Sequence, residues 1–176
     1  MTQKDKPLVN RVERSGLLTL DLADFYPEVE FATFDLKDFL FMELILKEKD
    51  FREGLKNHDW SQYEGKVLLV GCSADAIIPM WAYMLVASHA QPFARELFFG
   101  NREAYLTHFF SRTIRALDVT PYIDQRIVIK GCGSKPIPPA AYLELTARLR
   151  PVARSIMYGE PCSTVPIFKK SPPTRT

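Results

Sequence analysis

The chain contains the same strand–helix–strand pattern twice, in residues 59–100 and 118–159. Each copy opens with Asp-x-x-x-Tyr and continues to an apolar run ending in Gly-Cys. Proline, Ala-Tyr, proline, Ala-Arg and glycine then follow in the same order. The spacing is 59 residues from Tyr83 to Tyr142 and 60 from Cys72 to Cys132, which predicts one gap in the loop after the cysteine. Because self-similarity at a fixed period marks the unit of folding, we interpret the two segments as an internal repeat.

The repeated segments predict a mostly parallel sheet. Continuous apolar runs next to glycine are typical of strands buried on both faces, and here such strands alternate with segments of helix length. We expect strands at 17–22, 67–70, 97–99, 127–130 and 155–158, and helices from Pro79, at 101–117 and at 139–149. A further helix is expected to begin after Asp35, which can cap it, and to end at Gly54 or Asn57. The sequence therefore predicts one α/β domain over residues 16–168, with a single sheet of about five strands, helices on both faces and a tandem βαβ repeat.

Composition and charge narrow the class of protein. Hydrophobic residues make up 47% of the chain and charged residues 25%, which is typical of a globular protein. The net charge of +2 gives no field that would attract nucleic acid, so no such partner is expected. Residues 1–15 predict a disordered leader without a secretion signal, and residues 169–176 a flexible basic tail. The most apolar stretch, 76–90, is too short to span a bilayer, so we expect a cytoplasmic protein without a membrane partner.

The three cysteines are candidate ligands. Cys72 and Cys132 each follow a predicted strand of the repeat, and Cys162 follows the last predicted strand. In an open parallel sheet the carboxyl ends of the strands lie along one edge, where ligands bind. If the three strands are neighbours, a separation of about 4.8 Å per strand brings the thiols within reach of one metal or cluster. The loops after Cys72 and Cys132 lead to helix starts, a setting that stabilises a thiolate.

Four interpretations of the cysteines stay open. They are small buried hydrophobic residues, ligands of a metal or iron–sulfur cluster, a nucleophilic or sulfur-carrying thiol, or part of an anion or nucleotide site. The last of these lacks any glycine-rich phosphate-binding motif. An iron–sulfur cluster usually takes four cysteines, and zinc also takes four ligands, so a site with three cysteines needs another ligand. Asp75 and Glu160 are the nearest oxygen candidates.

The other polar residues in these segments have ordinary explanations as well. Lys130 and Lys135 flank Cys132 and either stabilise a thiolate or are simply exposed lysines. Asp75 fits a helix cap as well as it fits a ligand. The three histidines are isolated in the sequence, and we interpret them as half-buried or helix-end residues rather than ligands.

Two long motifs resemble a known family. They are Cys-Ser-Ala-Asp-Ala-Ile-Ile-Pro-x-Trp-Ala-Tyr-Met-Leu at 72–85 and Met-Tyr-Gly-Glu-Pro-Cys-Ser-Thr-Val-Pro at 157–166. With the signature Gly-Glu-Pro-Cys-Ser-x-Val-Pro, the chain resembles a small bacterial family known only as a domain of unknown function, and the similarity runs from Gly16 to Pro166. The resemblance assigns neither an activity nor catalytic residues. It implies a link to iron–sulfur cluster assembly.

The sequence therefore predicts a protein that binds an iron–sulfur cluster or zinc, as an accessory to cluster assembly and with assembly proteins as partners. The expected ligands are Cys72, Cys132 and Cys162, with Asp75 and Glu160 as supporting oxygens. The alternatives are a non-enzymatic structural or interaction protein with buried cysteines, and a sulfur-transfer enzyme with one activated cysteine. These patterns decide neither whether the chain is an enzyme nor its oligomeric state.

Overall fold

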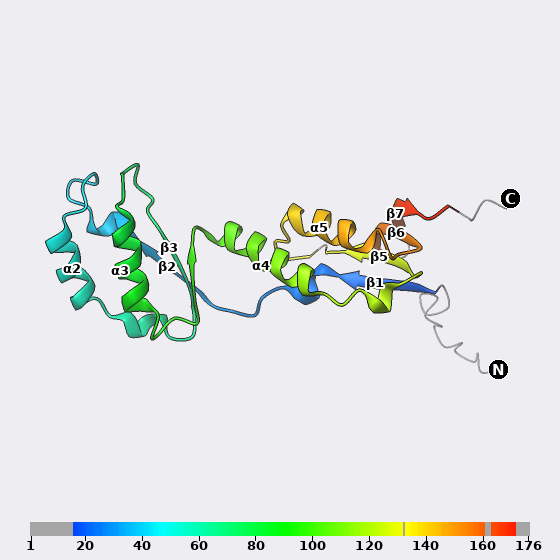
Figure 1. Ribbon diagram of the computed structural model, residues 1–176, viewed down its shortest axis with the longest axis horizontal. Helices are drawn as coiled ribbons and strands as arrows, with labels where there is room; N and C mark the ends of the chain where they lie inside the picture. The colour runs from blue at the N-terminus through cyan, green and yellow to red at the C-terminus, as the bar shows by residue number, and fades with distance from the viewer. Residues whose placement is uncertain (1–15, 132, 161–162, 172–176) are drawn as a thin grey trace, which may run out of the picture. The chain divides into compact units, whose positions relative to one another are not determined.

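The computed structural model describes residues 16–131, 133–160 and 163–171 (Figure 1). The described strands form two sheets: sheet A has the order β1-β5-β6-β7 and sheet B the order β2-β3-β4. Every neighbouring pair of strands is parallel except β6 and β7, which are antiparallel. The predicted α/β class with mostly parallel strands is confirmed. The distribution of strands differs from the expectation, because they lie in two sheets rather than in one sheet of about five strands.

Contacts divide the chain into two compact units. Unit 1 comprises residues 1–26 and 107–176, as far as they are described, and unit 2 comprises Pro27–Leu106. The chain thus enters unit 1, builds unit 2 and returns to complete unit 1. The helix α4 (Arg102–Ala116) begins in unit 2 and continues in unit 1.

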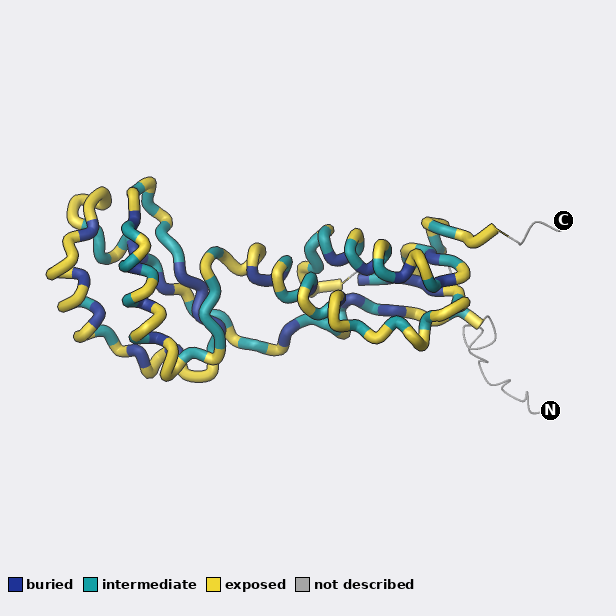
Figure 2. The backbone as a smooth tube through the Cα atoms, viewed as in Figure 1, coloured by how far each residue is buried: buried dark blue, intermediate teal, exposed yellow. Residues whose placement is uncertain are grey.

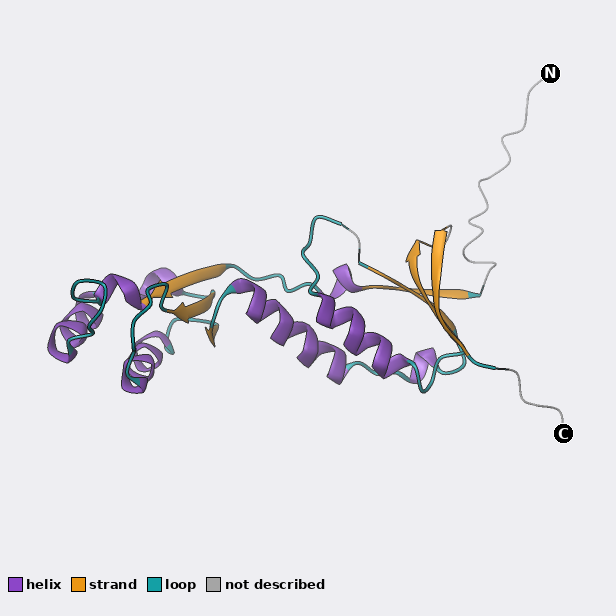
Figure 3. Cartoon of the chain, turned by 90° about the horizontal axis from the view of Figure 1, so that it is seen from above, coloured by secondary structure: helices purple, strands orange, loops and turns teal. Residues whose placement is uncertain are grey.

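Unit 1 holds sheet A. Its elements are β1 (Leu17–Asp21), the 3-10 helices η1 (Leu22–Phe25) and η4 (Thr120–Tyr122), β5 (Arg126–Lys130), α5 (Pro139–Leu149), β6 (Ser155–Glu160) and β7 (Ser163–Lys169). Figure 3 shows α5 and the later part of α4 on the same side of sheet A. Ile127, Ile129 and Ile156 of the sheet pack there against Leu145 and Leu149 of α5, and all five side chains are buried. This apolar layer is the core of unit 1.

Unit 2 holds sheet B. Its elements are β2 (Phe31–Asp35), the 3-10 helices η2 (Leu36–Phe39) and η3 (Trp60–Tyr63), α2 (Glu48–Asn57), β3 (Val67–Gly71), α3 (Met80–Ala90) and β4 (Glu96–Phe99). The middle strand β3 is buried along Val67–Val70, as its continuous apolar run predicts (Figure 2). Phe51 and Leu55 of α2 and Ala82 and Val86 of α3 form a separate core with this sheet.

The long helix expected after Asp35 is wrong in its extent. Phe31–Asp35 is instead the strand β2, and Asp35 caps only the short helix η2. Met42 and Glu43 then have positive φ angles of 54° and 58°, a backbone conformation that ends a right-handed helix. The regular helix α2 begins later, at Glu48. The strand β2 was missed because Phe-Ala-Thr-Phe-Asp is too short to show a clear period.

The two units contain the same elements in the same register. Leu17 of β1 pairs with Arg126 of β5, and Phe31 of β2 pairs with Val67 of β3. The last parallel strand in each unit also starts in the same register, with Arg126 opposite Ser155 and Val67 opposite Glu96. The helices α3 (Met80–Ala90) and α5 (Pro139–Leu149) have equal lengths, and their first residues are 59 positions apart.

The constant offset changes the alignment of the cysteines. Val67 and Arg126 are 59 residues apart, as are Glu96 and Ser155, so β3 and β5 correspond without a gap. At this offset Cys72 corresponds to Gly131 and not to Cys132. The gap predicted after the cysteine is therefore wrong, because the register of the strands places the two cysteines one position out of step.

Candidate functional site

The predicted cysteines follow strands of two different sheets. Cys72 comes directly after β3 of sheet B, where its side chain is half-buried and its thiol donates to the carbonyl oxygen of Ala74 at 3.6 Å. Burial first, and then the nearby Cys72, raises the pKa of Tyr83 above its ordinary value. Cys132 and Cys162 lie outside the described residues. The condition that all three preceding strands are neighbours holds for β5 and β6 but fails for β3.

The two predicted oxygen ligands are both exposed. Asp75 makes no side-chain hydrogen bond or ion pair with a described residue, and it does not cap α3, whose N-cap is Pro79. Glu160 is the last residue of β6, and its charge contributes to raising the pKa of Lys130. Within residues 16–131, 133–160 and 163–171, no group of three cysteine, histidine, aspartate or glutamate side chains is placed to hold a metal ion.

A charged cluster lies at the carboxyl edge of sheet A. The Nζ of Lys130 is 3.1 Å from an Asp21 carboxylate oxygen, and Lys135 donates to the carbonyl oxygen of Ala23 at 3.1 Å. Partial burial acts to raise the pKa of Asp21, but the N–H of Ala23 and the Lys130 ammonium hold that pKa below its ordinary value. The hydrogen bond with Asp21 and its charge raise the pKa of Lys130. The edge therefore keeps a carboxylate and ammonium groups charged next to the sequence position of Cys132.

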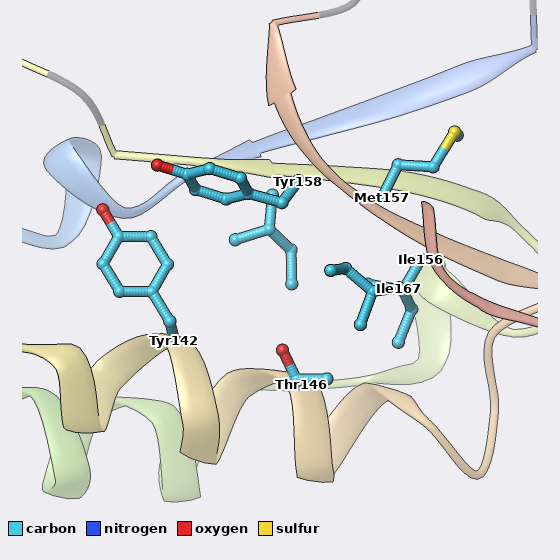
Figure 4. Close-up of a pocket in the computed structure, with 7 residues that line it drawn as sticks. Tyr142, Thr146, Ile156, Met157, Tyr158 and Ile167 are labelled. Carbon is cyan, nitrogen blue, oxygen red and sulfur yellow. The ribbon is translucent and has the colours of Figure 1, made fainter. Parts of the chain in front are cut away.

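A pocket of about 300 Å³ lies in unit 1 between α5 and sheet A. Its lining residues come from α5 and three strands: Ile129, Tyr142, Thr146, Ile156, Met157, Tyr158 and Ile167. Figure 4 shows Tyr142 and Thr146 rising from α5 toward the strands, with Tyr158 opposite them and the Met157 thioether pointing away from the helix. The rings of Tyr142 and Tyr158 meet edge to face, with centroids 5.9 Å apart. The pocket is apolar, with three hydroxyl groups and no charged lining residue.

A glycine makes room for one wall of this pocket. A Cβ at Gly131 would collide with the Tyr142 hydroxyl and would lie 3.2 Å from the Cβ of Leu22. Glycine is thus the residue that lets Tyr142 reach the end of β5. Sequence analysis missed Tyr142, Thr146 and Tyr158 as site residues. The signal for Tyr142 was available, because its Ala-Tyr motif recurs in the repeat, but only the packing of α5 on the sheet places it in a pocket.

The histidines of unit 2 belong to an aromatic cluster. The His89 ring stacks on Trp60, with centroids 5.5 Å apart and an interplanar angle of 15°. The Nε2 of His58 is 2.8 Å from the Tyr63 hydroxyl. Both histidines are half-buried, as expected for packed residues. These contacts give the two rings a structural role in the core of unit 2.

The fold and the pocket define an α/β protein with a small apolar site near the carboxyl edge of a mostly parallel sheet. The chain belongs to the family described as "Protein of unknown function (DUF2480)", whose family model matches residues 6–170. Comparison with curated proteins and with solved structures found no match. The resemblance to an uncharacterised family is thereby confirmed at the level of the family. Among the helices of the described residues, none is both long and apolar enough to cross a membrane.

Proposed function

We propose that this protein binds a small, mostly apolar molecule in the pocket between α5 and sheet A. The observation that carries this proposal is a pocket of about 300 Å³ with an apolar lining and the hydroxyls of Tyr142, Thr146 and Tyr158. Pockets of this composition are the usual sites of small ligands, and in parallel sheets such sites lie toward the carboxyl ends of the strands. Ile129 and Tyr158 stand close to those ends in β5 and β6.

The lining also restricts the chemistry of the ligand. No lysine, arginine, aspartate or glutamate lines the pocket, so a charge inside it would lose hydration without gaining a partner. The hydroxyl of Thr146 makes no side-chain hydrogen bond with a described residue, and it rises into the space shown in Figure 4. A neutral ring or a short acyl chain with one hydrogen-bonding oxygen or nitrogen fits these conditions. The volume lies at the lower end of the range for ligand pockets.

Filling the pocket tests this proposal. One-ring aromatic amides and short-chain fatty amides serve as probes in ligand-observed NMR with the full chain. The Thr146→Leu variant should lose probe binding, because the larger side chain occupies the space above α5. The control is Ala87→Leu, which makes a similar change at the corresponding, exposed position of α3 and should leave binding unchanged. If no probe binds the wild-type chain, or if Thr146→Leu binds it equally well, the pocket is not a ligand site.

A thiol-based metal or iron–sulfur centre is our second proposal, in a narrower form than the sequence suggested. It is supported by the pairing of β5 with β6, since Cys132 and Cys162 each come two residues after the end of one of these adjacent parallel strands. Glu160 is the described residue best placed to add an oxygen ligand. Cys72 follows a strand of the other sheet and is not needed. Two thiolates and one carboxylate suit zinc with an added water, or a cluster completed by an outside ligand.

Metal analysis of protein purified without oxygen tests this second proposal. Cys132→Ser and Cys162→Ser should each lower the metal content per chain severalfold, whereas Cys72→Ser should leave it unchanged. Colourless wild-type protein without zinc or iron would contradict the proposal. A cytoplasmic location and a partnership with iron–sulfur assembly proteins stay predictions from the sequence.

We further propose that the two units descend from a duplication. The equal register of their strands and the constant offset of 59 residues between their helices support this origin. Matching backbone hydrogen bonds support it as well, because the N–H of Arg95 donates to Lys66 and the N–H of Arg154 donates to Gln125.

A further inference from the structure

The two sheets differ at one edge. In sheet A, β6 lies between β5 and β7, and β7 runs antiparallel along it. In sheet B, the corresponding strand β4 pairs only with β3, since after β4 the chain continues into α4. Unit 2 therefore lacks the strand that covers the equivalent edge in unit 1. An edge strand without a neighbour is a template for pairing with another strand.

A pair of aromatic rings shows what the missing strand would cover. Tyr83 and Phe99 meet edge to face with centroids 5.3 Å apart, as Tyr142 and Tyr158 do at 5.9 Å in unit 1. Phe99 is nevertheless 71% exposed, whereas Tyr158 is 38% exposed. In unit 1 the strand β7 lies beside β6, and its Ile167 lines the pocket together with Tyr158. Unit 2 keeps the aromatic pair and has nothing in the place of Ile167.

The backbone after β4 has the shape that accompanies a paired strand. Gly100 has a φ of 126°, and Gly159 at the corresponding position has a φ of 119°. In unit 1 this shape has a clear use, because Gly159 pairs with Thr164 of β7 and a Cβ there would lie 2.6 Å from the Ser163 carbonyl oxygen. Gly100 has the same conformation without a partner strand.

An apolar stripe on α3 and the turn before it adds to this surface. Ile77 is 94% exposed, and Met80 and Met84 are each 70% exposed. Their spacing of three and four residues favours one helix face, and Tyr83 of the same helix contacts Phe99. A four-residue strand edge alone is too small for a stable interface, which buries about 1,600 Å² in total. The strand and the stripe together offer a larger apolar area.

We infer that a second copy of this chain covers the edge, with β4 paired antiparallel to β4 of the partner across a two-fold axis. Two identical strands related by such an axis are antiparallel, which is the arrangement that β7 gives to β6. With Leu97 opposite Phe98 of the other copy, each Glu96 faces Phe99, so like charges do not meet. The segments outside the described residues are poor substitutes, since residues 1–15 are rich in charge and 172–176 begin with two prolines.

Sedimentation velocity over about 1 to 100 µM full-length protein tests this inference, because a dimer forms by mass action. The wild-type chain should shift from monomer to dimer with concentration. Phe99→Glu and Met84→Glu should each raise the dissociation constant at least about tenfold, since they place a charge in an apolar interface. The matched control is Leu143→Glu on α5, because Leu143 corresponds to Met84 and is similarly exposed at 73%. This variant should dimerise like the wild type.

Hydrogen exchange adds a measurement that needs no substitution. Amides of β4 should exchange more slowly at concentrations where the dimer dominates, while those of β7 should not change. A wild-type chain that stays monomeric over the whole range overturns the inference. So does a dimer that Phe99→Glu leaves intact, or one whose β4 amides gain no protection, because either result places the interface elsewhere or on a different partner.

Discussion

At the scale of single residues, two aspartates have the same position in the two units. Asp21 ends β1 and accepts from the N–H of Ala23 at 2.9 Å, and Asp35 ends β2 and accepts from the N–H of Lys37 at 3.0 Å. Asp35 also accepts from the N–H of Ser73 at 3.0 Å, which ties the end of β2 to the loop after β3. Burial acts to raise the pKa of Asp35, but these hydrogen bonds hold it below its ordinary value. The ionised form is therefore the one that stabilises unit 2.

Asp35→Asn should lower the free energy of unfolding at neutral pH by about 1 kcal/mol, the usual cost of losing a capping carboxylate. Because the pKa of Asp35 is lower in the folded state, its contribution is complete above about pH 4, the pKa in the unfolded chain, and is lost as the pH falls through the folded value. The difference between variant and wild type should shrink below that pH. Urea unfolding at graded pH measures it. Asp38→Asn, an exposed change in the same short helix, is the control.

At the scale of elements, the hairpin of β6 and β7 depends on a glycine. Gly159→Ala should cost about 2 kcal/mol, because alanine disfavours a φ of 119° and its Cβ would meet the Ser163 carbonyl. Gly133→Ala is the control, since no atom lies within 4 Å of its added Cβ. Thermal unfolding compares the two variants. Equal stability would show that β7 adapts to the added methyl group.

The elements also show which patterns in the sequence were informative. The strands β3 and β5 were predicted because their apolar runs are continuous and lie next to glycine. The strands β2 and β7 were not, because β2 is short and β7 contains Pro166, which argues against a strand. A second repeated motif was overlooked: Leu-Asp-Leu-x-Asp-Phe at 20–25 and Phe-Asp-Leu-x-Asp-Phe at 34–39. It indicates two equivalent first strands, and hence two sheets.

At the scale of the whole molecule, each unit has a core of its own. Leu145 is fully buried in the core of unit 1, and Val86 is fully buried at the corresponding position of unit 2. Leu145→Ala should cost about 3 kcal/mol and should speed amide exchange in β5 more than in β3. Val86→Ala should cost less, because it removes fewer methyl groups, and should have the opposite preference. Hydrogen exchange followed by mass spectrometry measures both. Equal loss of protection in the two sheets would show that the units unfold together.

The amino-acid sequence by itself determined the α/β class, the family and the strand–helix–strand order of each half, because hydrophobic runs, prolines and glycines act locally along the chain. Only the tertiary structure decided that the strands form two sheets, so that Cys72 follows a strand of one and Cys132 and Cys162 follow strands of the other. It also created the pocket of Tyr142, Thr146 and Tyr158, and it left β4 at an edge. Strand neighbours are contacts between residues distant in the chain, and a local pattern carries no information on which distant strand will supply the hydrogen bonds.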